Sequence, residues 1–177
     1  MKHKHTITNR SARSGFTLVE ILIVVIILGI LAAIVIPQFA SASNDARKNS
    51  LMSQMQLVRS QLSLYALEHR DAYPPLLIAG GATAWDNMTV KTNADHTTTG
   101  TPTLGPYLMQ SPVNHLNSLT TVTVVTGTTD YGTGGVAAPG SAGAWVFNAS
   151  TGKIWATSAK RGFIYNERNA NDANNAN

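Results

Sequence analysis

Three residues near the N-terminus, Gly15, Phe16 and Glu20, form the most chemically suggestive group in this chain of 177 residues. Glu20 is the only ionisable side chain from Phe16 to Asn44, and it lies near the start of an almost unbroken apolar run. An ionised carboxylate at the centre of a bilayer costs about 2.5–3.5 kcal/mol, so it requires a partner. Cutting the peptide bond after Gly15 would create a positively charged α-amino group on Phe16, close to Glu20 in its own and neighbouring chains. The partner of Glu20 must therefore come from another molecule, from the basic arm before Gly15, or from a new positive group of this kind.

Other residue types that perform chemistry are scattered along the chain. There is no cysteine, which excludes disulfides, thiolate metal sites and cysteine nucleophiles. His69, His96 and His115 each stand without a histidine four residues away, so we expect no metal site. Neither a phosphate-binding glycine loop nor a nucleophile elbow is present. We therefore do not expect an enzyme.

The formal net charge of +4 belongs to the first fifteen residues. Four of the 13 basic side chains lie there with no acid, so nine basic side chains face nine acidic ones from Phe16 onward. Because phosphate binding needs clustered Lys and Arg, no nucleic-acid partner is expected. A basic arm before an apolar run instead indicates a leader that stays in the cytoplasm, with everything after Pro37 exported.

One long helix is expected to position the candidate residues. Residues 16–36 would form a helix of roughly 31 Å, which matches the hydrocarbon thickness of a bilayer. Apolar residues then recur at helical spacing over 51–65, which predicts an amphipathic face packed against a sheet. We expect this helix to run to residue 71, to bend near Pro37 and to end at Tyr73-Pro74-Pro75.

Short strands are expected at 119–126, 144–148 and 153–157, the last two joined by a hairpin turn at 149–152. The connection over 76–103 is expected to be mostly irregular, with one short element near residues 85–90. The expected organisation is a cleaved cytoplasmic leader at 1–15, a transmembrane half-helix at 16–37, an amphipathic half-helix at 38–72, a globular domain at 73–165 and a disordered Asn-rich tail at 166–177.

The sequence RSGFTLVE at residues 13–20, followed by the apolar run, resembles the class III signal of type IV pilins and pseudopilins. This resemblance implies that a prepilin peptidase cuts between Gly15 and Phe16 and that the new amine of Phe16 is N-methylated. It also implies that Glu20 guides the addition of subunits to a filament. Gly29 and Pro37 lie where the family usually has residues that loosen or bend the helix.

Within that superfamily the chain looks most like the major pseudopilin of type II secretion systems. The similarity rests on ILGILA at 27–32, the Tyr73-Pro74 stop, GPYL at 105–108 and the lack of cysteine. It implies an α+β, type IV pilin-like fold in which one long N-terminal helix packs on a small antiparallel β-sheet. It also implies a single-pass protein of the bacterial inner membrane, with its C-terminal domain in the periplasm before filament assembly. The implied partners are further copies of the chain, prepilin peptidase, minor pseudopilins and an inner-membrane assembly platform with its ATPase.

Major pseudopilins often bind calcium in a late loop through Asp and backbone oxygens. Here Asp130 is the only carboxylate between Asp95 and Glu167, whereas Ca²⁺ sites usually recruit more than one. We therefore expect no cofactor, and a calcium loop near Asp130 is the alternative.

Two other functions stay open. One is a type IV pilus major or minor pilin, which would serve adhesion, motility or DNA uptake. The other is a secreted or membrane-anchored binding module. An A-x-A pattern at residues 40–42 would suit conventional signal-peptide cleavage and release such a module from Ser43 onward.

Overall fold

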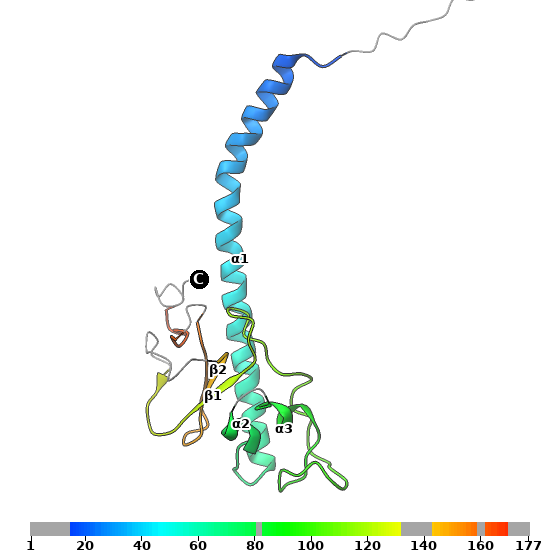
Figure 1. Ribbon diagram of the computed structural model, residues 1–177, viewed down its shortest axis with the longest axis vertical. Helices are drawn as coiled ribbons and strands as arrows, with labels where there is room; N and C mark the ends of the chain where they lie inside the picture. The colour runs from blue at the N-terminus through cyan, green and yellow to red at the C-terminus, as the bar shows by residue number, and fades with distance from the viewer. Residues whose placement is uncertain (1–14, 81–82, 132–142, 159–161, 170–177) are drawn as a thin grey trace, which may run out of the picture. The chain divides into compact units, whose positions relative to one another are not determined.

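The computed structural model describes residues 15–80, 83–131, 143–158 and 162–169 (Figure 1). Within these ranges three helices and three strands follow one another in the order α1, α2, α3, β1, β2, β3. The chain divides into two compact units, Met1–Ser43 and Asn44–Asn177, and α1 (Leu18–Glu68) contributes to both. Apart from Gly15, the predicted leader lies outside the described residues.

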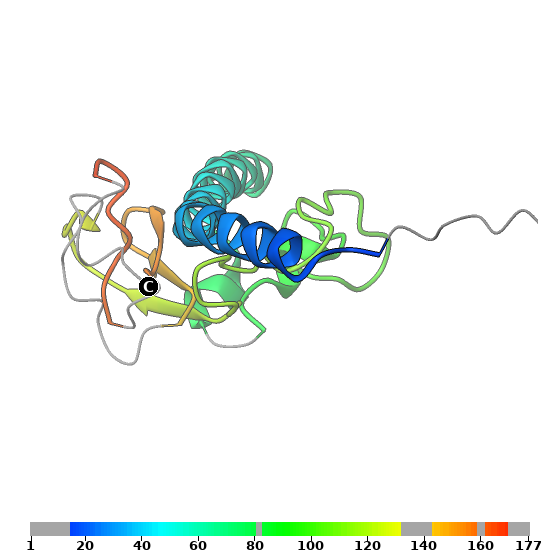
Figure 2. The same cartoon turned by 90° about the horizontal axis from the view of Figure 1, so that it is seen from above.

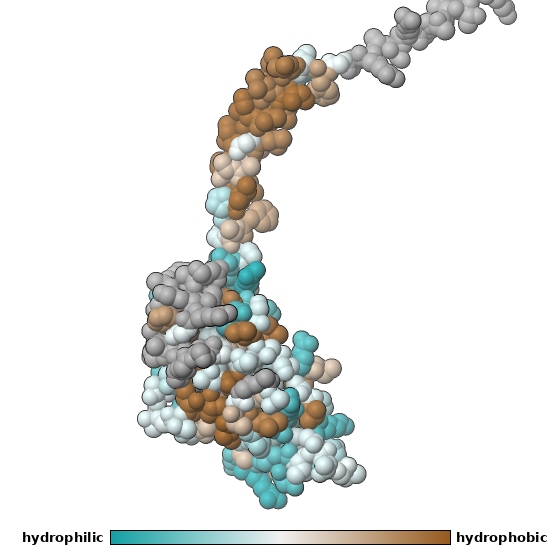
Figure 3. Space-filling model, in the orientation of Figure 1, coloured by the Kyte–Doolittle hydropathy of each residue, from teal (hydrophilic) through white to brown (hydrophobic). Residues whose placement is uncertain are grey.

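The first unit consists, in its described part, of a short N-terminal extension and the first half of α1. This half is helical without interruption through Gly29 and Pro37, and the bend expected at these residues stays a prediction. Its large apolar side chains are all exposed, from 43% for Val35 to 82% for Leu18. Figure 3 shows them covering the visible face of this part of α1. Among the described residues, α1 contains the one stretch that is long and apolar enough to cross a membrane.

The second unit has a core built on one face of α1. Five side chains of the helix are at most 2% exposed, and their spacing of four and three residues follows the helical turn. They are Leu51, Met55, Val58, Leu62 and Tyr65. In the same core cluster are Trp145 and Phe147 of the sheet and Trp85 of the connecting segment. The prediction of an amphipathic half-helix packed on the sheet is therefore confirmed.

Strands β1 (Val122–Val125), β2 (Trp145–Asn148) and β3 (Ile154–Ala156) form a sheet in the order β1-β2-β3. The predicted hairpin is confirmed, since β2 and β3 are antiparallel with Phe147 opposite Ile154. The prediction of a purely antiparallel sheet is wrong, because β1 runs parallel to β2. A parallel pair needs a crossover of a dozen or more residues, and the segment from 126 to 144 is long enough for one.

The two faces of the sheet bury different side chains. Trp145 and Phe147 belong to the core cluster that α1 shares, whereas Val146 between them packs with Trp155 and Ile164 in a second cluster. This alternation is the two-residue period of a strand. The sheet is covered on both faces, which explains why β2 consists of four consecutive buried residues.

The segments around the end of α1 differ from the predicted ones in two respects. The helix ends at Glu68, before the Tyr73-Pro74 stop, because Arg70 and Asp71 adopt positive φ angles of 58° and 62°. A short helix, α2 (Pro75–Ala79), then begins at a proline, which suits the first helical position.

Helix α3 (Asp86–Thr89) is the short element predicted near residues 85–90. Within the second unit, α3 and the following segment lie on one side of α1, and the strands lie on the other (Figures 1 and 2).

The predicted disordered tail at 166–177 is wrong for its first residues. Asn166 is 7% exposed, and its side-chain oxygen accepts hydrogen bonds from the backbone N–H groups of Arg168 and Asn169, both at 3.1 Å. Glu167 forms a two-pronged ion pair with Arg59 of α1, at 2.8 and 2.6 Å. Composition alone could not reveal this partner, which is 108 residues away in the sequence. Residues 170–177 lie outside the described residues.

Candidate functional site

The first turn of α1 holds Glu20 in a reciprocal hydrogen-bond arrangement with Thr17. Glu20 Oε2 accepts hydrogen bonds from the backbone N–H of Thr17 at 2.8 Å and from its hydroxyl at 2.9 Å. Thr17 Oγ1 in turn accepts from the backbone N–H of Glu20 at 3.2 Å. The Thr17 carbonyl accepts the first helical bond, from Ile21 at 3.4 Å. Thr17 is therefore the N-cap of α1, and the two side chains form a capping box.

Sequence reasoning missed Thr17. From the sequence we expected a charged partner for Glu20 in the arm, in another chain or in a new amine. In the structure the carboxylate has a neutral partner, the Thr17 hydroxyl, three residues away. The signal that could have found this partner is the T-x-x-E spacing ahead of an apolar run. Because Thr17 donates neutral hydrogen bonds, the negative charge of Glu20 is not cancelled by this contact.

The predicted cut lies next to the capping box and leaves it intact. The N–H that Thr17 donates belongs to the Phe16–Thr17 peptide bond, which a cut after Gly15 does not touch. Phe16 is 82% exposed, and no heavy atom outside its neighbours lies within 4 Å of a Cβ built on Gly15. The Gly15–Phe16 bond is thus exposed in the described chain, one residue ahead of the capping box that holds the Glu20 carboxylate.

A family model described as the prokaryotic N-terminal methylation motif matches residues 10–36 of the chain. This segment of the chain is therefore similar to the N-terminal methylation motifs of other prokaryotic proteins. The matched residues include the predicted cut, the predicted methyl acceptor Phe16 and the capping box of Thr17 and Glu20.

Several known proteins resemble part of the chain. It is 43% identical over 65 residues to the type II secretion system core protein G of Pseudomonas aeruginosa, across 37% of this chain and 45% of that protein. It is 40% identical over 60 residues to the protein of the same name from Dickeya chrysanthemi, across 34% of this chain and 39% of that protein. It is also 35% identical over 88 residues to a type IV major fimbrial protein FimA of Dichelobacter nodosus, across 45% of this chain and 56% of that protein.

The chain therefore spans about two fifths to just over half of the length of these relatives. The predicted resemblance to type IV pilins and type II secretion pseudopilins is confirmed by the methylation signal and by these similarities. The long helix on a small sheet is likewise the type IV pilin-like α+β fold that was expected. No solved structure matches the chain.

Two of the histidines that stand singly in the sequence meet in the second unit. The ring of His69 stacks on Tyr65 with centroids 3.8 Å apart, and the His96 ring stacks on His69 at 4.9 Å. His69 Nδ1 bonds the Tyr65 carbonyl at 2.9 Å, and its Nε2 bonds Thr92 Oγ1 at 2.9 Å. A carbonyl only accepts, so Nδ1 of His69 carries a proton and Nε2 can accept from Thr92.

His96 closes this stack from a neighbouring turn. Its Nδ1 lies 2.7 Å from the Tyr65 hydroxyl. Burial raises the pKa of Tyr65 to about 12, so its hydroxyl stays protonated and donates to a neutral His96. Burial also lowers the pKa of His96, as does the neighbouring His69, while Asp95 opposes the shift. The rings of His69 and His96 are stacked, and their bonded nitrogens face different groups: Tyr65 and Thr92 for His69, and the Tyr65 hydroxyl for His96. The two histidines therefore contribute to packing and hydrogen bonding.

Asp130, the residue of the alternative calcium loop, lies opposite a lysine. Its Oδ2 is 3.1 Å from Lys153 Nζ at the start of the β3 segment. Within the described part of the chain, no group of three or more His, Cys, Asp or Glu side chains is placed to hold a metal ion. Calcium binding thus stays untested by this geometry.

Proposed function

We propose that this chain is a structural subunit of a helical filament based in the bacterial inner membrane. Its precursor is cut after Gly15 by a prepilin peptidase and N-methylated on Phe16. The observation that carries the proposal is the capped Glu20 carboxylate at the start of an apolar half-helix with exposed side chains, inside a matched methylation motif. The pseudopilus of a type II secretion system is the machine that the relatives favour, and protein secretion is the process it serves.

The physical basis of assembly is the pairing of Glu20 with an amine. Cleavage places a positive charge on Phe16, and bundling of apolar helices brings the Phe16 amine of one subunit near the Glu20 of another. An axial stagger that leaves Glu20 unpaired in an apolar core is penalised, so charge pairing favours one register. The bundle also covers the apolar side chains that the single chain exposes.

The proposed location and partners follow from the same elements. The apolar half of α1 anchors the subunit in the inner membrane, with the basic leader in the cytoplasm and the second unit in the periplasm. Further copies of the chain, minor pseudopilins and an inner-membrane assembly platform with its ATPase complete the machine. In this role the chain is not an enzyme and uses no cofactor, since the chemistry is done to it by the peptidase.

The mature N-terminus tests the proposal. Mass spectrometry of the protein isolated from its membrane should show a first residue of N-methylated Phe16. A chain that starts at Ser43 would indicate a secreted binding module, and a chain that keeps residues 1–15 would indicate an ordinary signal anchor. Either result would contradict the filament proposal.

A type IV pilus pilin is the second candidate, because the similarity to the fimbrial protein FimA extends over more residues than that to the secretion proteins. The two machines differ in where the filament ends. Electron microscopy of cells that express the chain at its natural level should show no surface fibres if it is a pseudopilin. Long surface fibres labelled by an antibody to the second unit would favour the pilus.

A further inference from the structure

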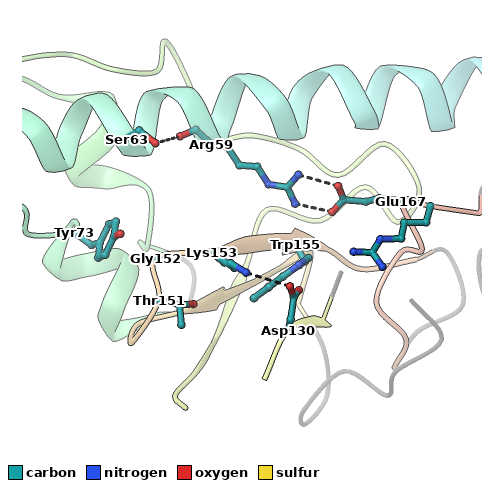
Figure 4. Close-up of a pocket in the computed structure, with 10 residues that line it drawn as sticks. Arg59, Ser63, Tyr73, Asp130, Thr151, Gly152, Lys153, Trp155 and Glu167 are labelled. Carbon is teal, nitrogen blue, oxygen red and sulfur yellow. Dashed lines mark hydrogen bonds and ion pairs between the residues drawn. The ribbon is translucent and has the colours of Figure 1, made fainter. Parts of the chain in front are cut away.

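A polar cavity lies in the second unit between α1, the β2–β3 hairpin and the C-terminal segment (Figure 4). Its volume is about 490 Å³, within the range of small-molecule sites. In Figure 4, Arg59 comes from the helix, Lys153 from the hairpin and Glu167 from the C-terminal segment. The proposed filament function makes no use of this cavity.

The wall of the cavity has one positive charge in excess. Three basic and two acidic side chains line it, namely Arg59, Lys153, Arg168, Asp130 and Glu167. Arg59 pairs with Glu167 at 2.6 and 2.8 Å, and Lys153 pairs with Asp130 at 3.1 Å. Within the described part of the chain, the guanidinium of Arg168 has neither an ion pair nor a hydrogen-bond partner. Arg168 is therefore the lining cation that remains for a ligand.

The two arginines of the cavity differ in what they can offer. The guanidinium of Arg59 is already occupied, since it holds Glu167 and also donates to the carbonyl of Ile154 at 2.8 and 3.2 Å. The backbone of Arg168 is held beside this clamp, because its N–H donates to the side-chain oxygen of Asn166 at 3.1 Å. Its side chain is exposed. A guanidinium in this state has five N–H donors, in a planar fork that fits a carboxylate.

Two hydroxyl groups add neutral hydrogen-bonding capacity to the wall. Within the described residues, the hydroxyls of Tyr73 and Thr151 have no hydrogen-bond partner in the protein. The Tyr73 ring packs edge-on against Phe147 of β2, with centroids 5.7 Å apart. Its hydroxyl lies over Gly152, where a Cβ would come within 1.9 Å of it. The missing side chain at Gly152 thus leaves the room that this hydroxyl occupies.

We propose that this cavity binds a sugar acid, a ligand with one carboxylate and several hydroxyls on a ring. The carboxylate pairs with the guanidinium of Arg168 through two hydrogen bonds. The ring hydroxyls both donate and accept, so they can bond the hydroxyls of Tyr73 and Thr151.

The charge of the wall selects a single negative charge. A neutral sugar gains no ion pair from Arg168, and a cation adds to the positive excess. A dianion brings a second negative charge close to Asp130 and Glu167, and like charges repel. It could pair that charge only by displacing Glu167 from Arg59, which would leave a carboxylate that is 18% exposed without its partner.

Saturation-transfer NMR on the full chain tests this proposal. The protein is held at pH 8 in a polyoxyethylene detergent, which has neither charge nor sugar. Three kinds of probe share the same ring: the monoanions D-glucuronate and D-galacturonate, the neutral sugars D-glucose and D-galactose, and D-glucose 6-phosphate, which carries close to two negative charges. At least one uronate should bind saturably and about tenfold or more tightly than its neutral sugar and than glucose 6-phosphate. No saturable binding of either uronate, or equal or tighter binding of a neutral sugar or of the phosphate, would overturn the proposal.

Two arginines provide a matched pair of variants. Arg168 and Arg47 are both exposed, but only Arg168 lines the cavity. Arg168→Gln should weaken uronate binding by about tenfold, to the level of the neutral sugar, whereas Arg47→Gln should leave it unchanged. Neither change should alter the melting temperature. Equal binding by the two Arg→Gln variants would show that the carboxylate binds elsewhere and would refute the assignment.

Tyr73→Phe tests the hydroxyl separately. The variant keeps the ring that packs on Phe147 and removes only the oxygen. Binding of the uronate should weaken severalfold, while the melting temperature should stay the same, because the hydroxyl has no partner within the described protein. Unchanged uronate binding in this variant would contradict the proposed place of the sugar ring.

Discussion

At the scale of single residues, the carboxylate of Glu20 both caps α1 and keeps a negative charge that can pair with a cation. Oε2 accepts both hydrogen bonds from Thr17 and caps the helix. The charge stays uncancelled, because both donors are neutral, and it is available to the amine that the proposed cleavage would create on Phe16. The cap thus fixes the carboxylate at the end of the helix in the single chain.

Replacing Gly15 with Leu should leave the precursor uncut. No heavy atom lies within 4 Å of a Cβ at Gly15, so the larger side chain should leave the fold unchanged. It should alter only the residue that precedes the bond cut by the peptidase. An immunoblot should show a single, slower-migrating band. Gly29→Ala is the matched control, since the space around Gly29 is also open, and it should be processed normally. Normal cutting of Gly15→Leu would contradict the leader assignment.

Changing Glu20 to Gln or Ala should allow processing but reduce assembly. The Gln side chain can still accept hydrogen bonds from Thr17 but carries no charge. Comparing Gln with Ala therefore separates the ion pair with the Phe16 amine from the capping of the helix. The complementary variant Thr17→Val keeps the charge and loses the side-chain cap, which costs helices about 0.5–2 kcal/mol. The yield of sheared filaments should fall strongly for Glu20→Gln and less for Thr17→Val. A wild-type yield from Glu20→Gln would refute charge pairing.

At the scale of elements, the end of α1 is held by side chains from segments that are distant in the sequence. Tyr65 and His69 of this end stack with His96, and Tyr107 packs edge-on against Tyr65 at 5.0 Å. The Tyr107 hydroxyl donates to the carboxylate of Glu68. The C-terminal segment is fastened in turn by Arg59. These contacts attach irregular segments, which have few backbone hydrogen bonds of their own, to a regular helix.

The stability of the second unit should fall as the pH drops below about 6.5, the pKa of an unperturbed histidine. The pKa of His96 is lowered in the folded protein, so the unfolded chain binds the proton more tightly. The contribution of His96 is therefore complete above the unfolded pKa and is lost as the pH falls through the folded one. Thermal unfolding between pH 8 and 5 measures the effect.

His96→Asn should flatten this pH dependence, because Asn does not titrate and tolerates the φ of 69° found at residue 96. His115→Asn, at an exposed histidine, is the control and should retain the full dependence. An unchanged pH profile in His96→Asn would show that another group is responsible.

Calcium should leave the melting temperature of the second unit unchanged to within about 1 °C. Asp130 is engaged with Lys153, and Ca²⁺ prefers six to eight oxygen ligands. The measurement is thermal unfolding with millimolar CaCl₂ against EDTA. A large upward shift that disappears in Asp130→Asn would establish the calcium loop instead.

At the scale of the whole molecule, the two units need different surroundings. The described part of Met1–Ser43 has no buried large apolar side chain, whereas Asn44–Asn177 has a core with fully buried Trp85 and Trp145. The first unit is stable only where lipid or other helices cover it, and the second can bury its own apolar surface.

A fragment that starts at Asn44 should therefore fold without detergent. It retains the buried face of α1, both core clusters and the Arg59–Glu167 pair. It should elute as a monomer and unfold cooperatively, whereas the full chain should require detergent or lipid. A fragment without a cooperative transition would show that the second unit depends on the first.

The local features of the chain could be predicted from sequence because they depend on neighbours in the chain. The apolar run, the buried stripe of α1 and the β2–β3 hairpin each follow from a short period or a turn. The methylation motif is likewise contiguous, so Gly15, Phe16 and Glu20 could be predicted together. Even Thr17 was within reach, since its partner is three residues away.

Contacts between distant segments were decided only by the tertiary structure. The parallel pairing of β1 with β2, the stacking of His96 on His69 and the clamp of Arg59 on Glu167 join residues that no local pattern relates. Each contact depends on how the chain returns to α1 and to the sheet, because side chains meet only after the backbone has been placed. The sequence by itself determined the methylation motif and the apolar run, which depend on neighbouring residues, and the tertiary structure alone decided the buried stack and the order of the described C-terminal segment.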